Sequence, residues 1–330
     1  MKNIVLLMKD SLRKTIFDAK TLKRLEDFGN VYINDCDQDP DSDRVKRLIK
    51  DAHIIITSWG CPTLDKYILD SAPNVELVAH AAGTVKGIVS DSLWDRGIRV
   101  TGSAKAIGIG VAETALGFTI ASLKNMWRLS KNTREGEWAL GKEDVREVYD
   151  VNIGVIGAGR AGRHYIELIK NFDVNILLYD PTIDDNTANK MGVKKVELEK
   201  IFKESDVLSI HAPSIPETDH MVNANTLAMM KDDAIIINTA RGSIIDEDAL
   251  IIELKKGRLF TCIDVTDPEP PSKDHPFRTL PNVILTPHIA GAVNNGLYRI
   301  GNYVAEEIAL YEAGEDMDGE ILREELESLA

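Results

Sequence analysis

Apolar and polar positions alternate along the chain with two periods, one typical of strands and one typical of helices. Short apolar runs in the first hundred residues predict strands at Ile4–Met8, Val31–Ile33, His53–Ser58, Val75–His80 and Ile98–Thr101. Between these runs, apolar residues recur every three or four positions and predict helices at Ser11–Phe28, Ser42–Asp51 and Leu64–Asp70, with a helical turn at Ser92–Arg96. Strands that alternate with helices in this way predict a parallel sheet with helices on its faces.

The second half of the chain repeats the alternation after a long helical pattern that runs from about Val111 to Glu135. Strands are predicted at Val151–Ile156, Val174–Tyr179, Val207–Ile210, Ala234–Asn238, Leu259–Val265 and Val283–Leu285. Helices are predicted at Asn223–Met230, Ile245–Lys256 and Gly296–Ala313. The acidic stretch Glu315–Ala330 is expected to lie on the surface or to fold back on the first unit.

A glycine-rich turn joins the first strand of the second half to a helical pattern. Its sequence is Gly157-Ala158-Gly159-Arg160-Ala161-Gly162, and the next apolar run ends in Asp180, 23 residues after Gly157. A G-x-G-x-x-G turn between a strand and a helix, followed by an acidic residue at this spacing, is typical of a dinucleotide-binding unit. The alternative is a glycine-rich turn that binds nothing, and the strand, helix and aspartate around the turn argue against it.

Each part of this turn has a physical task in holding a dinucleotide. Gly157 permits a tight turn, Gly159 lets the backbone approach a pyrophosphate, and Gly162 lets the helix pack closely on the strand. The helix N-terminus offers unpaired N–H groups to the phosphates. Asp180 can accept hydrogen bonds from both ribose hydroxyls, and its charge repels a 2′-phosphate. The sequence therefore favours NAD over NADP.

Composition narrows the class of partner. The 330 residues are enough for two domains of ordinary size, and 44% hydrophobic with 28% charged residues is ordinary globular usage. A formal charge of −14 repels phosphate backbones, which argues against nucleic acid and anionic membranes as partners. Three cysteines without a C-x-x-C pair suit a reducing compartment, and no apolar run is judged long enough to cross a membrane. We expect a cytoplasmic protein.

Polar residues follow the predicted strands of the second half, where open parallel sheets bind their ligands. They are Asp180, His211, Thr239 with Arg241, Asp264 with Glu269, and His288. Because several ionisable groups follow successive strands of one sheet, we expect them to converge on one cleft.

Three of these side chains fit proton transfer next to an anionic substrate. A guanidinium such as that of Arg241 can bind a carboxylate with two parallel hydrogen bonds. The imidazole of His288 is suited to proton transfer near neutral pH, and Glu269, between two prolines, is the carboxylate that can orient it. Each has a structural alternative, namely an ion pair, a structural histidine or an exposed acidic loop. No metal-ligand spacing and no G-x-S-x-G nucleophile elbow occurs in the sequence.

These segments together resemble the D-isomer-specific 2-hydroxyacid dehydrogenase family. The resemblance is dense from about Val100 to Gly291 and weaker before it. Its strings are Val111-Ala112-Glu113, the glycine turn, Tyr179-Asp180-Pro181, Ser205-Asp206-Val207-Leu208-Ser209-Ile210-His211-Ala212-Pro213, Asn238-Thr239-Ala240-Arg241-Gly242, Asp264-Val265 with Glu269-Pro270, and Pro287-His288-Ile289-Ala290-Gly291.

The resemblance implies an α/β protein of two domains, each a parallel sheet flanked by helices. A flavodoxin-like substrate domain is expected over 1–101 and 296–330, and a Rossmann-type NAD-binding domain over 102–295. The resemblance implies that His288 is the general acid and base, with Glu269 as its partner, and that Arg241 binds the substrate. It also implies that Asp264 holds the nicotinamide carboxamide. The remaining cofactor-lining residues are His211, Ala212, Pro213, Thr239, Ala240, Arg241 and His288. The long helix from Val111 is expected to help form a homodimer.

The expected activity is reduction of a small 2-keto acid by NADH, as in glyoxylate and hydroxypyruvate reductases. Family members that oxidise formate carry glutamine where this chain has Glu269, which argues against that branch. Two alternatives stay open: a 3-phosphoglycerate dehydrogenase, and a protein of another class, an NAD-sensing scaffold or corepressor without turnover.

One segment departs from the family pattern. Where relatives carry a glycine-rich G-x-G-x-D-N loop for the substrate carboxylate, this chain has Ala79-His80-Ala81-Ala82-Gly83-Thr84-Val85-Lys86-Gly87. Gly83, Thr84 and Lys86 are therefore candidate substrate contacts. Our hypothesis is that Lys86 or His80 contacts an additional polar or anionic group of the substrate. The alternative is that Lys86 points to solvent.

Overall fold

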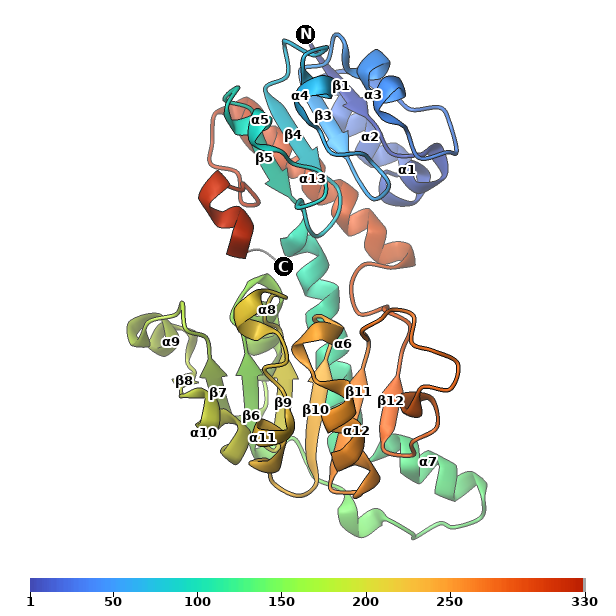
Figure 1. The fold of residues 1–330 in the computed structure, drawn as a ribbon, viewed down its shortest axis with the longest axis vertical. Helices are drawn as coiled ribbons and strands as arrows, with labels where there is room; N and C mark the ends of the chain where they lie inside the picture. Colours follow the sequence, from blue (N-terminus) through green and yellow to red (C-terminus); the bar gives the residue numbers. More distant parts are fainter. Residues whose placement is uncertain (329–330) are drawn as a thin grey trace. The chain divides into compact units, whose positions relative to one another are not determined.

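The computed structural model describes residues 1–328 and divides the chain into two compact units (Figure 1). Unit 1 comprises Met1–Ile107 and Ala292–Ala330, and unit 2 comprises Gly108–Gly291. Each unit has its own parallel sheet, flanked by helices. The predicted α/β class is therefore confirmed.

The sheet of unit 1 has the flavodoxin-like strand order β2-β1-β3-β4-β5. Its strands are β1 (Lys2–Leu6), β2 (Gly29–Ile33), β3 (Ile54–Thr57), β4 (Leu77–His80) and β5 (Arg99–Gly102). Its helices are α1 (Asp10–Ile16), α2 (Ala19–Glu26), α3 (Ser42–Ile49), α4 (Lys66–Leu69), α5 (Asp91–Trp94) and α13 (Leu297–Ala313).

Successive residues of β1 contribute to different cores, because side chains of a strand alternate between the faces of its sheet. Ile4 and Leu6 pack with residues of α1, α2 and α13, whereas Val5 packs with residues of α3, α4 and α5. The C-terminal stretch folds back on this unit, where Ile321 joins the second of these cores and donates its N–H to the Val100 carbonyl. Both faces of the sheet are thus covered.

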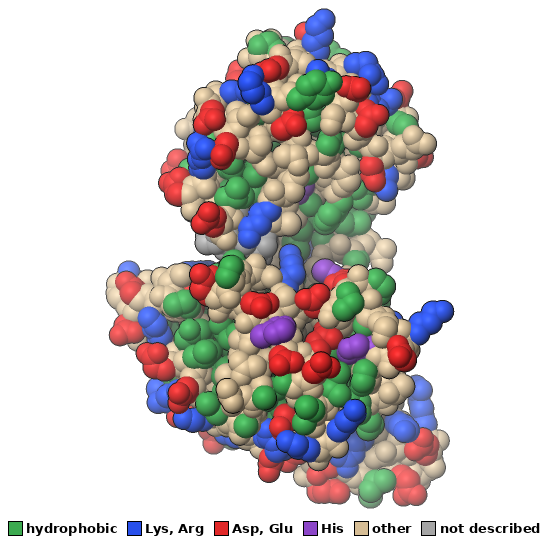
Figure 2. All heavy atoms as spheres, viewed as in Figure 1, with side chains coloured by type: hydrophobic (Ala, Val, Ile, Leu, Met, Phe, Trp, Pro, Cys, Tyr) green, Lys and Arg blue, Asp and Glu red, His purple; other side chains and the backbone are tan. Residues whose placement is uncertain are grey.

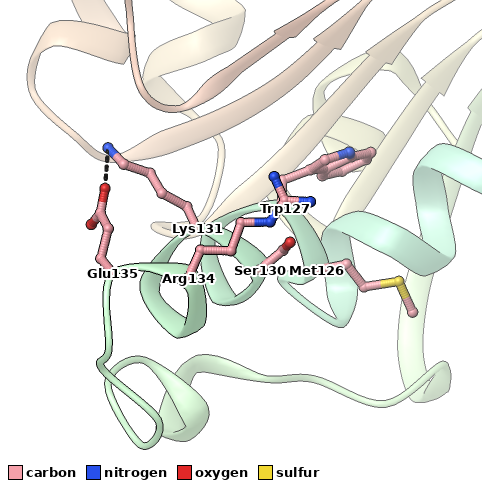
Figure 3. A pocket seen from close by; sticks show the side chains of 6 residues that line it. All are labelled: Met126, Trp127, Ser130, Lys131, Arg134 and Glu135. Carbon is pink, nitrogen blue, oxygen red and sulfur yellow. Dashed lines mark ion pairs between the residues drawn. The ribbon is translucent and has the colours of Figure 1, made fainter.

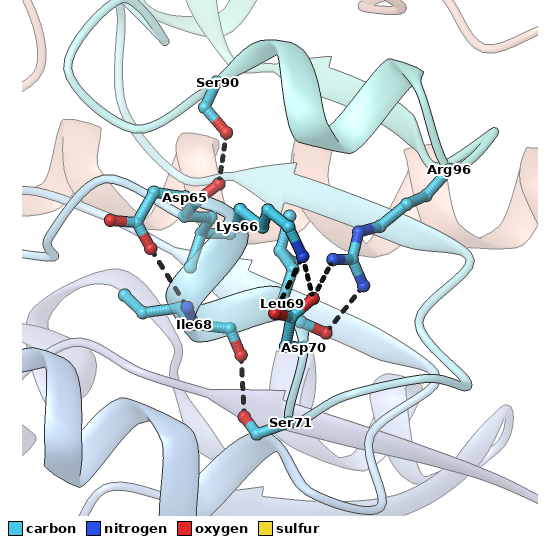
Figure 4. A network of polar contacts seen from close by, with 9 residues as sticks. Asp65, Lys66, Ile68, Leu69, Asp70, Ser71, Ser90 and Arg96 are labelled. Carbon is cyan, nitrogen blue, oxygen red and sulfur yellow. Dashed lines mark hydrogen bonds and ion pairs between the residues drawn. The ribbon is translucent and has the colours of Figure 1, made fainter.

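A polar network anchors α4 to the segment that contains α5 (Figure 4). Asp65 caps α4 by accepting from the Ile68 N–H at 3.0 Å. Asp70 accepts from Lys66 at 2.9 Å and from Arg96, whose guanidinium also donates to the Leu69 carbonyl. Arg96 follows α5, so its contacts link the two helices.

Two helices predicted as continuous are each broken in the structure. The predicted Ser11–Phe28 helix consists of α1 and α2, because Asp18 accepts from the Thr21 N–H at 2.7 Å and starts a new helix. The predicted Val111–Glu135 helix consists of α6 (Ala104–Leu123) and α7 (Met126–Arg134). Asn125, at φ 50°, has a left-handed backbone that ends the regular helix between them.

The sheet of unit 2 has the order β12-β11-β10-β9-β6-β7-β8. Its strands are β6 (Tyr149–Ile156), β7 (Asp173–Tyr179), β8 (Lys194–Lys195), β9 (Val207–Ile210), β10 (Ala234–Asn238), β11 (Leu259–Ile263) and β12 (Val283–Leu285). Its other helices are α8 (Arg160–Ile169), α9 (Asp185–Met191), α10 (Leu198–Glu204), α11 (Ala224–Ala228) and α12 (Glu247–Lys255). Chain order reverses between the neighbours β6 and β9, the switch point at which Rossmann-type sheets bind dinucleotides.

Several short elements lie outside the sequence predictions. They are β8, α9, α10 and the 3₁₀ turns η1 (Lys142–Asp144), η2 (Pro216–Thr218), η3 (Gly242–Ile244), η4 (Pro276–Arg278), η5 (Asn294–Gly296) and η6 (Arg323–Ser328). Three of these turns, η3, η4 and η5, lie in the segments that follow β10, β11 and β12.

Helix α6 is long and apolar enough to cross a membrane by length and composition, contrary to the expectation from the sequence. Its contacts explain the apolar composition in another way. Ala112 and Ala115 lie in a core cluster of unit 2, and Thr119 shares a 2.7 Å hydrogen bond with the fully buried Tyr165 of α8. On the face drawn in Figure 2, acidic and basic side chains are interspersed.

Candidate active site

One row of register brings six strands of unit 2 to a common edge. The paired residues, in sheet order, are Tyr179, Ile156, Ile210, Asn238, Ile263 and Leu285. Because the strands are parallel, the residues that follow this row leave the sheet on the same side. The residues directly after the row are Asp180, Gly157, His211, Thr239, Asp264 and Thr286. Arg241 and His288 each come three positions after the row.

The glycine turn is packed so tightly that two of its glycines admit no side chain. Gly157 has φ 91°, and a Cβ built on it lies 2.7 Å from the Ala212 nitrogen. A Cβ on Gly162 lies 2.0 Å from the Gly157 carbonyl oxygen, so only glycine lets α8 approach the turn. A Cβ on Gly159 has nothing within 4 Å. The turn thus packs tightly against the rest of unit 2 at Gly157 and Gly162 and leaves open space at Gly159.

Asp180 ties the glycine turn to the end of β7. Its Oδ2 accepts from the Ala158 N–H at 2.7 Å, and its Oδ1 accepts from the Thr182 N–H and hydroxyl at 2.8 and 2.7 Å. The carboxylate keeps an acceptor site on Oδ2, because each carboxylate oxygen can accept about two hydrogen bonds. Asp180 therefore braces the turn and retains capacity for a ribose hydroxyl.

His211 packs against the same glycine turn. Its side chain is 8% exposed, its ring contacts that of Tyr165, and its Nε2 shares a 2.9 Å hydrogen bond with the Ser209 hydroxyl. Burial lowers the pKa of His211 to about 3, so the imidazole is neutral at neutral pH. The ring is packed inside the unit, and the backbone that follows β9, through Ala212 and Pro213, is what reaches the turn.

Arg241 is placed by the turn that follows β10. The Asn238 side chain accepts from the Ala240 N–H at 3.0 Å and donates to the Arg241 carbonyl at 2.8 Å. A Cβ on Gly242 lies 2.2 Å from the Thr266 carbonyl carbon, so this turn packs directly on the segment that follows β11. Asn238 was missed by sequence reasoning, although an amide directly before a sharp turn is a usable signal.

Asp264 organises the loop that carries His288. Its carboxylate accepts from the Thr286 hydroxyl at 2.6 Å and from the N–H groups of Ile289 and Ala290 at 2.9 and 2.7 Å. Its carbonyl accepts from the His288 N–H at 3.0 Å. Asp264 is 2% exposed, and these bonds give it a role in holding the loop that the sequence did not indicate. Thr286, two residues before the histidine, was also missed.

His288 and Glu269 meet. Nδ1 of His288 lies 2.7 Å from Oε1 of Glu269, and their side chains are 48% and 42% exposed. When the carboxylate is ionised, this contact places the ring proton on Nδ1 and makes Nε2 the nitrogen that can exchange a proton with a ligand. The backbone of His288 has φ 53°, a left-handed conformation that is uncommon for residues other than glycine and often marks functional sites.

The edge of unit 2 fits a dinucleotide. The open space at Gly159 leaves room for phosphates at the N-terminus of α8. Thr239 carries a buried hydroxyl without a hydrogen-bond partner at the end of β10. Such unpaired groups are costly unless a ligand or water satisfies them. Within residues 1–328, no three His, Cys, Asp or Glu side chains gather as metal ligands do.

The candidate substrate loop lies in unit 1, after β4. Thr84 and Lys86 are exposed and Gly83 is partly exposed. His80 is 3% exposed and its Nδ1 shares a 2.9 Å hydrogen bond with the Thr57 hydroxyl. Burial lowers the pKa of His80 to about 4, so it carries no charge at neutral pH. Of the two residues in our hypothesis, Lys86 is therefore the one able to meet an anionic group.

Comparison with known proteins identifies related chains. Residues 116–290 match the family model described as "D-isomer specific 2-hydroxyacid dehydrogenase, NAD binding domain". A D-3-phosphoglycerate dehydrogenase of Methanocaldococcus jannaschii is 33% identical over 296 residues, which cover 89% of this chain and 56% of that protein. A glyoxylate reductase of Korarchaeum cryptofilum is 32% identical over 299 residues, which cover 89% of this chain and 90% of that protein.

Solved structures share the fold. A phosphoglycerate oxidoreductase from Rhizobium etli matches with a TM-score of 0.85 at 22% identity, covering 98% of this chain and 99% of that chain. At this identity the likeness concerns the fold alone. This chain spans just over half the length of the phosphoglycerate dehydrogenase above, and nearly the full length of the glyoxylate reductase.

Proposed function

Because the chain belongs to the D-isomer-specific 2-hydroxyacid dehydrogenase family, we propose that it is an NAD-dependent reductase of small 2-keto acids. The observation that carries this proposal is the 2.7 Å contact between His288 and Glu269, at the strand edge that holds the glycine turn. In this proposal unit 2 binds the cofactor and unit 1 contributes the substrate loop.

His288 is the proton donor in the direction of reduction. When bound, the reduced nicotinamide supplies a hydride to the keto carbon of the substrate. The protonated ring of His288 gives its Nε2 proton to the keto oxygen, and Glu269 stabilises the imidazolium through Nδ1. The products are the 2-hydroxy acid and the oxidised cofactor, and a proton from solvent restores the ring.

Arg241 binds the substrate and neutralises charge that develops on the keto oxygen. Its guanidinium donates to the Ala240 carbonyl at 2.7 Å, a contact that restrains the side chain near the turn. The other N–H groups are then available for a carboxylate and the adjacent oxygen. Electrostatic preorganisation of this kind contributes about 3 kcal/mol to lowering the barrier.

NAD is the proposed cofactor form. The Asp180 carboxylate stands at the end of β7 beside the glycine turn, where its charge disfavours a 2′-phosphate. Asp264, Thr239 and the backbone around Pro213 line the rest of the proposed cofactor site, and Asp264 has one acceptor position left for the carboxamide. These assignments come from the family resemblance, and the residues concerned follow the strand ends of unit 2.

Glyoxylate and hydroxypyruvate are the first substrates to test. The similarity to a glyoxylate reductase over nearly the full length of both chains supports this choice. A second candidate activity is that of a 3-phosphoglycerate dehydrogenase, which the 33% identity to such an enzyme favours. The D configuration of the product is implied by the family alone.

A keto-acid screen tests the function. Purified protein is assayed with NADH and with NADPH against glyoxylate, hydroxypyruvate, pyruvate, 2-oxoglutarate, larger keto acids and 3-phosphohydroxypyruvate, and the product is resolved by chiral chromatography. We expect turnover with NADH, and a D product from the keto acids whose products are chiral, that is, all of the panel except glyoxylate. NADH binding without turnover on the whole panel would instead support an NAD-sensing scaffold.

We further propose that the protein forms a homodimer through α7 and the connector that follows it. Exposed apolar side chains occur there, namely Met126, Trp138 and Leu140. A hollow of about 540 Å³ lies along α7, lined by Met126, Trp127, Ser130, Lys131, Arg134 and Glu135 (Figure 3). Covering these side chains with a second copy removes apolar area from water. Light scattering should give twice the chain mass, and Trp138→Ser should shift the protein toward the monomer.

We propose a cytoplasmic location as well. Cys36, Cys61 and Cys262 are free, and burial raises the pKa of Cys61 to about 11 and that of Cys262 to about 12. Thiols held in this state are unreactive and need no oxidising compartment. Cell fractionation with an antibody against the chain is the direct test.

A further inference from the structure

The segment that carries Glu269 is anchored on both sides by one carboxylate that the proposed mechanism does not use. Glu247 is the first residue of α12 and lies six residues after Arg241. Its Oε1 accepts from the Asp267 N–H at 3.0 Å. Its Oε2 lies 3.1 Å from Nε2 of His275. Asp267 comes two residues before Glu269 and His275 six residues after it.

The direction of the second contact follows from the other ring nitrogen. Nδ1 of His275 accepts from the Phe277 N–H at 3.3 Å, so this nitrogen carries no proton. The ring proton is then on Nε2 and is donated to Glu247. The His275 ring also packs edge-on against Phe277, with 4.7 Å between centroids, and Phe277 is 2% exposed. His275 is therefore fixed to the core at one side and to Glu247 at the other.

Burial makes this contact more than a surface ion pair. The side chains of Glu247 and His275 are 13% and 17% exposed, against 42% for Glu269. A largely buried carboxylate that accepts two hydrogen bonds in fixed directions restrains both donors, whereas exposed pairs contribute little. Arg278 closes the same loop by donating to the carbonyls of Ser272 and Pro271, both at 2.8 Å.

We propose that Glu247 is a positioning residue of the active site: its carboxylate holds both flanks of the Glu269 segment and so keeps Glu269 on Nδ1 of His288. This proposal rests on the proposed function, because a change in turnover can be interpreted only if the protein is the proposed reductase. The contacts themselves can be tested without any turnover. Because Glu247 lies six residues after Arg241 in the chain, its carboxylate links the segment of the proposed substrate-binding group to the segment of Glu269.

The ionised form of Glu247 is the form that can accept both hydrogen bonds. The titratable groups that face it are His275, Asp267 and, on its own helix, Asp248. Burial, followed by the charges of these two aspartates, raises the pKa of Glu247 to about 7. A raised pKa means that the folded surroundings favour the protonated carboxyl, so ionisation does not strengthen the hold on the loop as the pH rises. The contacts of Glu247 with Asp267 and His275 therefore carry the argument, and not its charge.

Four variants separate positioning from general damage. Glu247→Ala removes both acceptors. Glu247→Gln keeps one acceptor for the Asp267 N–H but turns an amide N–H toward the His275 proton. His275→Gln keeps a donor toward Glu247 and should be the mildest of the three. Asp185→Asn is the matched control, since Asp185 is an exposed acid in the first turn of another helix of unit 2, α9.

Steady-state kinetics with glyoxylate and NADH give the first readout. At pH 8 we expect kcat to fall about tenfold in Glu247→Ala and less in Glu247→Gln, with the NADH dissociation constant within twofold of wild type, because a small displacement of a catalytic group costs rate and not cofactor binding. A kcat within twofold of wild type in both variants would overturn the proposal.

The second readout needs no substrate. The ¹⁵N chemical shifts of the His288 ring report which nitrogen carries the proton, and Glu269 should hold that proton on Nδ1 in the wild-type protein. We expect Glu247→Ala, or Glu247→Gln if the alanine variant does not fold, to mix the two tautomers, while Asp185→Asn leaves them unchanged. An unaltered tautomer in the Glu247 variants contradicts the proposal, even if no keto acid is turned over and the proposed function itself has failed.

Discussion

Both sheets bring a histidine to their strand-end edge, and the two side chains differ in almost every physical respect. In unit 1, Thr57, His80 and Gly102 lie in one row of register, and His80 is buried against the Thr57 hydroxyl. In unit 2, His288 comes three residues after the corresponding row, is half exposed, and meets the carboxylate of Glu269. The first is a structural histidine and the second is the proposed acid and base.

The comparison shows that a histidine can stand at the end of a strand in either sheet, and that the loop after the strand determines whether its side chain is buried or available to a ligand. His80 belongs to β4 itself, so its ring stays between the sheet and the turn, and the Ser103 hydroxyl also binds its carbonyl at 2.8 Å. His288 lies in a loop organised by Asp264, which leaves the ring at the surface. The two parallel sheets are alike in kind, and their chemistry differs because their connections differ.

Replacing the imidazole of unit 2 should have the largest effect. His288→Asn suits the left-handed backbone better than alanine does, because asparagine tolerates positive φ. We expect kcat to fall by at least about 100-fold, since proton transfer is lost, while NADH still binds. Stopped-flow and fluorescence titration measure the two quantities. The control is His220→Asn, an exposed histidine of the same unit with φ 48°. Equal losses in both variants would remove His288 from its role.

Arg241→Lys should mainly raise the KM for the keto acid, by about tenfold, because one point charge replaces a two-pronged hydrogen bond. The KM for NADH should change by less than twofold, and this serves as the internal control. Initial rates over a matrix of both substrates separate the two constants. If kcat fell while the keto-acid KM stayed constant, Arg241 would act on the transition state and not on substrate binding.

Asp180→Ala should narrow the preference for NAD over NADP by about tenfold, because the charge that repels the 2′-phosphate is gone. The same change removes the acceptor of the Ala158 N–H, so it can also loosen the glycine turn. Asp180→Asn separates these effects, since its amide oxygen can still accept one bond while the charge is lost. The ratio of kcat/KM for NADH and NADPH is the measurement. Unchanged discrimination in both variants would refute the assignment of Asp180.

The buried histidine of unit 1 should act on stability and not on turnover. Its pKa is about 4 in the folded chain, because burial disfavours the imidazolium, against 6.5 for an ordinary histidine. The unfolded chain therefore binds the extra proton first as the pH falls, so this contribution is intact above pH 6.5 and is lost progressively toward pH 4.

Urea unfolding of unit 1 signals at pH 7.5, 6 and 5 can test this sign. The wild-type protein should lose more stability over this range than His80→Asn does, because the asparagine cannot take up the proton. His220→Asn controls for the loss of an exposed histidine. Parallel curves for wild type and His80→Asn would mean that His80 is not buried as described. His211, whose pKa burial also lowers, contributes equally to both proteins and cancels in the difference.

Local patterns predicted the elements well, because strand and helix periods depend on neighbouring residues. The apolar runs that end at His80, Ile210 and Asn238 end at the same residues in the structure. The break at Asn125 was missed because a single left-handed residue leaves the apolar period nearly intact. Burial of His80 was missed because nothing in the sequence distinguishes a strand-end histidine that points inward from one that points outward.

The site was predicted unevenly for a related reason. The resemblance named His288 and Glu269, and their contact agrees with the paired role it implied. The support of these two residues was not foreseen. Asp264 was named only for the nicotinamide carboxamide, because its role in the loop depends on three bonds to residues more than twenty positions away. Glu247 was not named at all, because it acts through a loop that begins twenty positions later. Such support depends on tertiary packing, which a single sequence does not display.

Replacing Lys86 should have the smallest effect on turnover of the proposed site variants. It also tests most directly whether the strand-end edge of unit 1 contacts the substrate. It lies exposed after β4, where the family pattern has an aspartate, and it keeps a positive charge that the buried His80 lacks. If Lys86 contacts a second anionic or polar group of the substrate, Lys86→Ala should raise the KM about threefold to tenfold for dicarboxylic or phosphorylated keto acids and leave glyoxylate unaffected. The control is Lys20→Ala, an exposed lysine on α2 of the same unit. An unchanged ranking of kcat/KM across the keto-acid panel would mean that Lys86 does not contact the substrate and that other residues determine substrate choice.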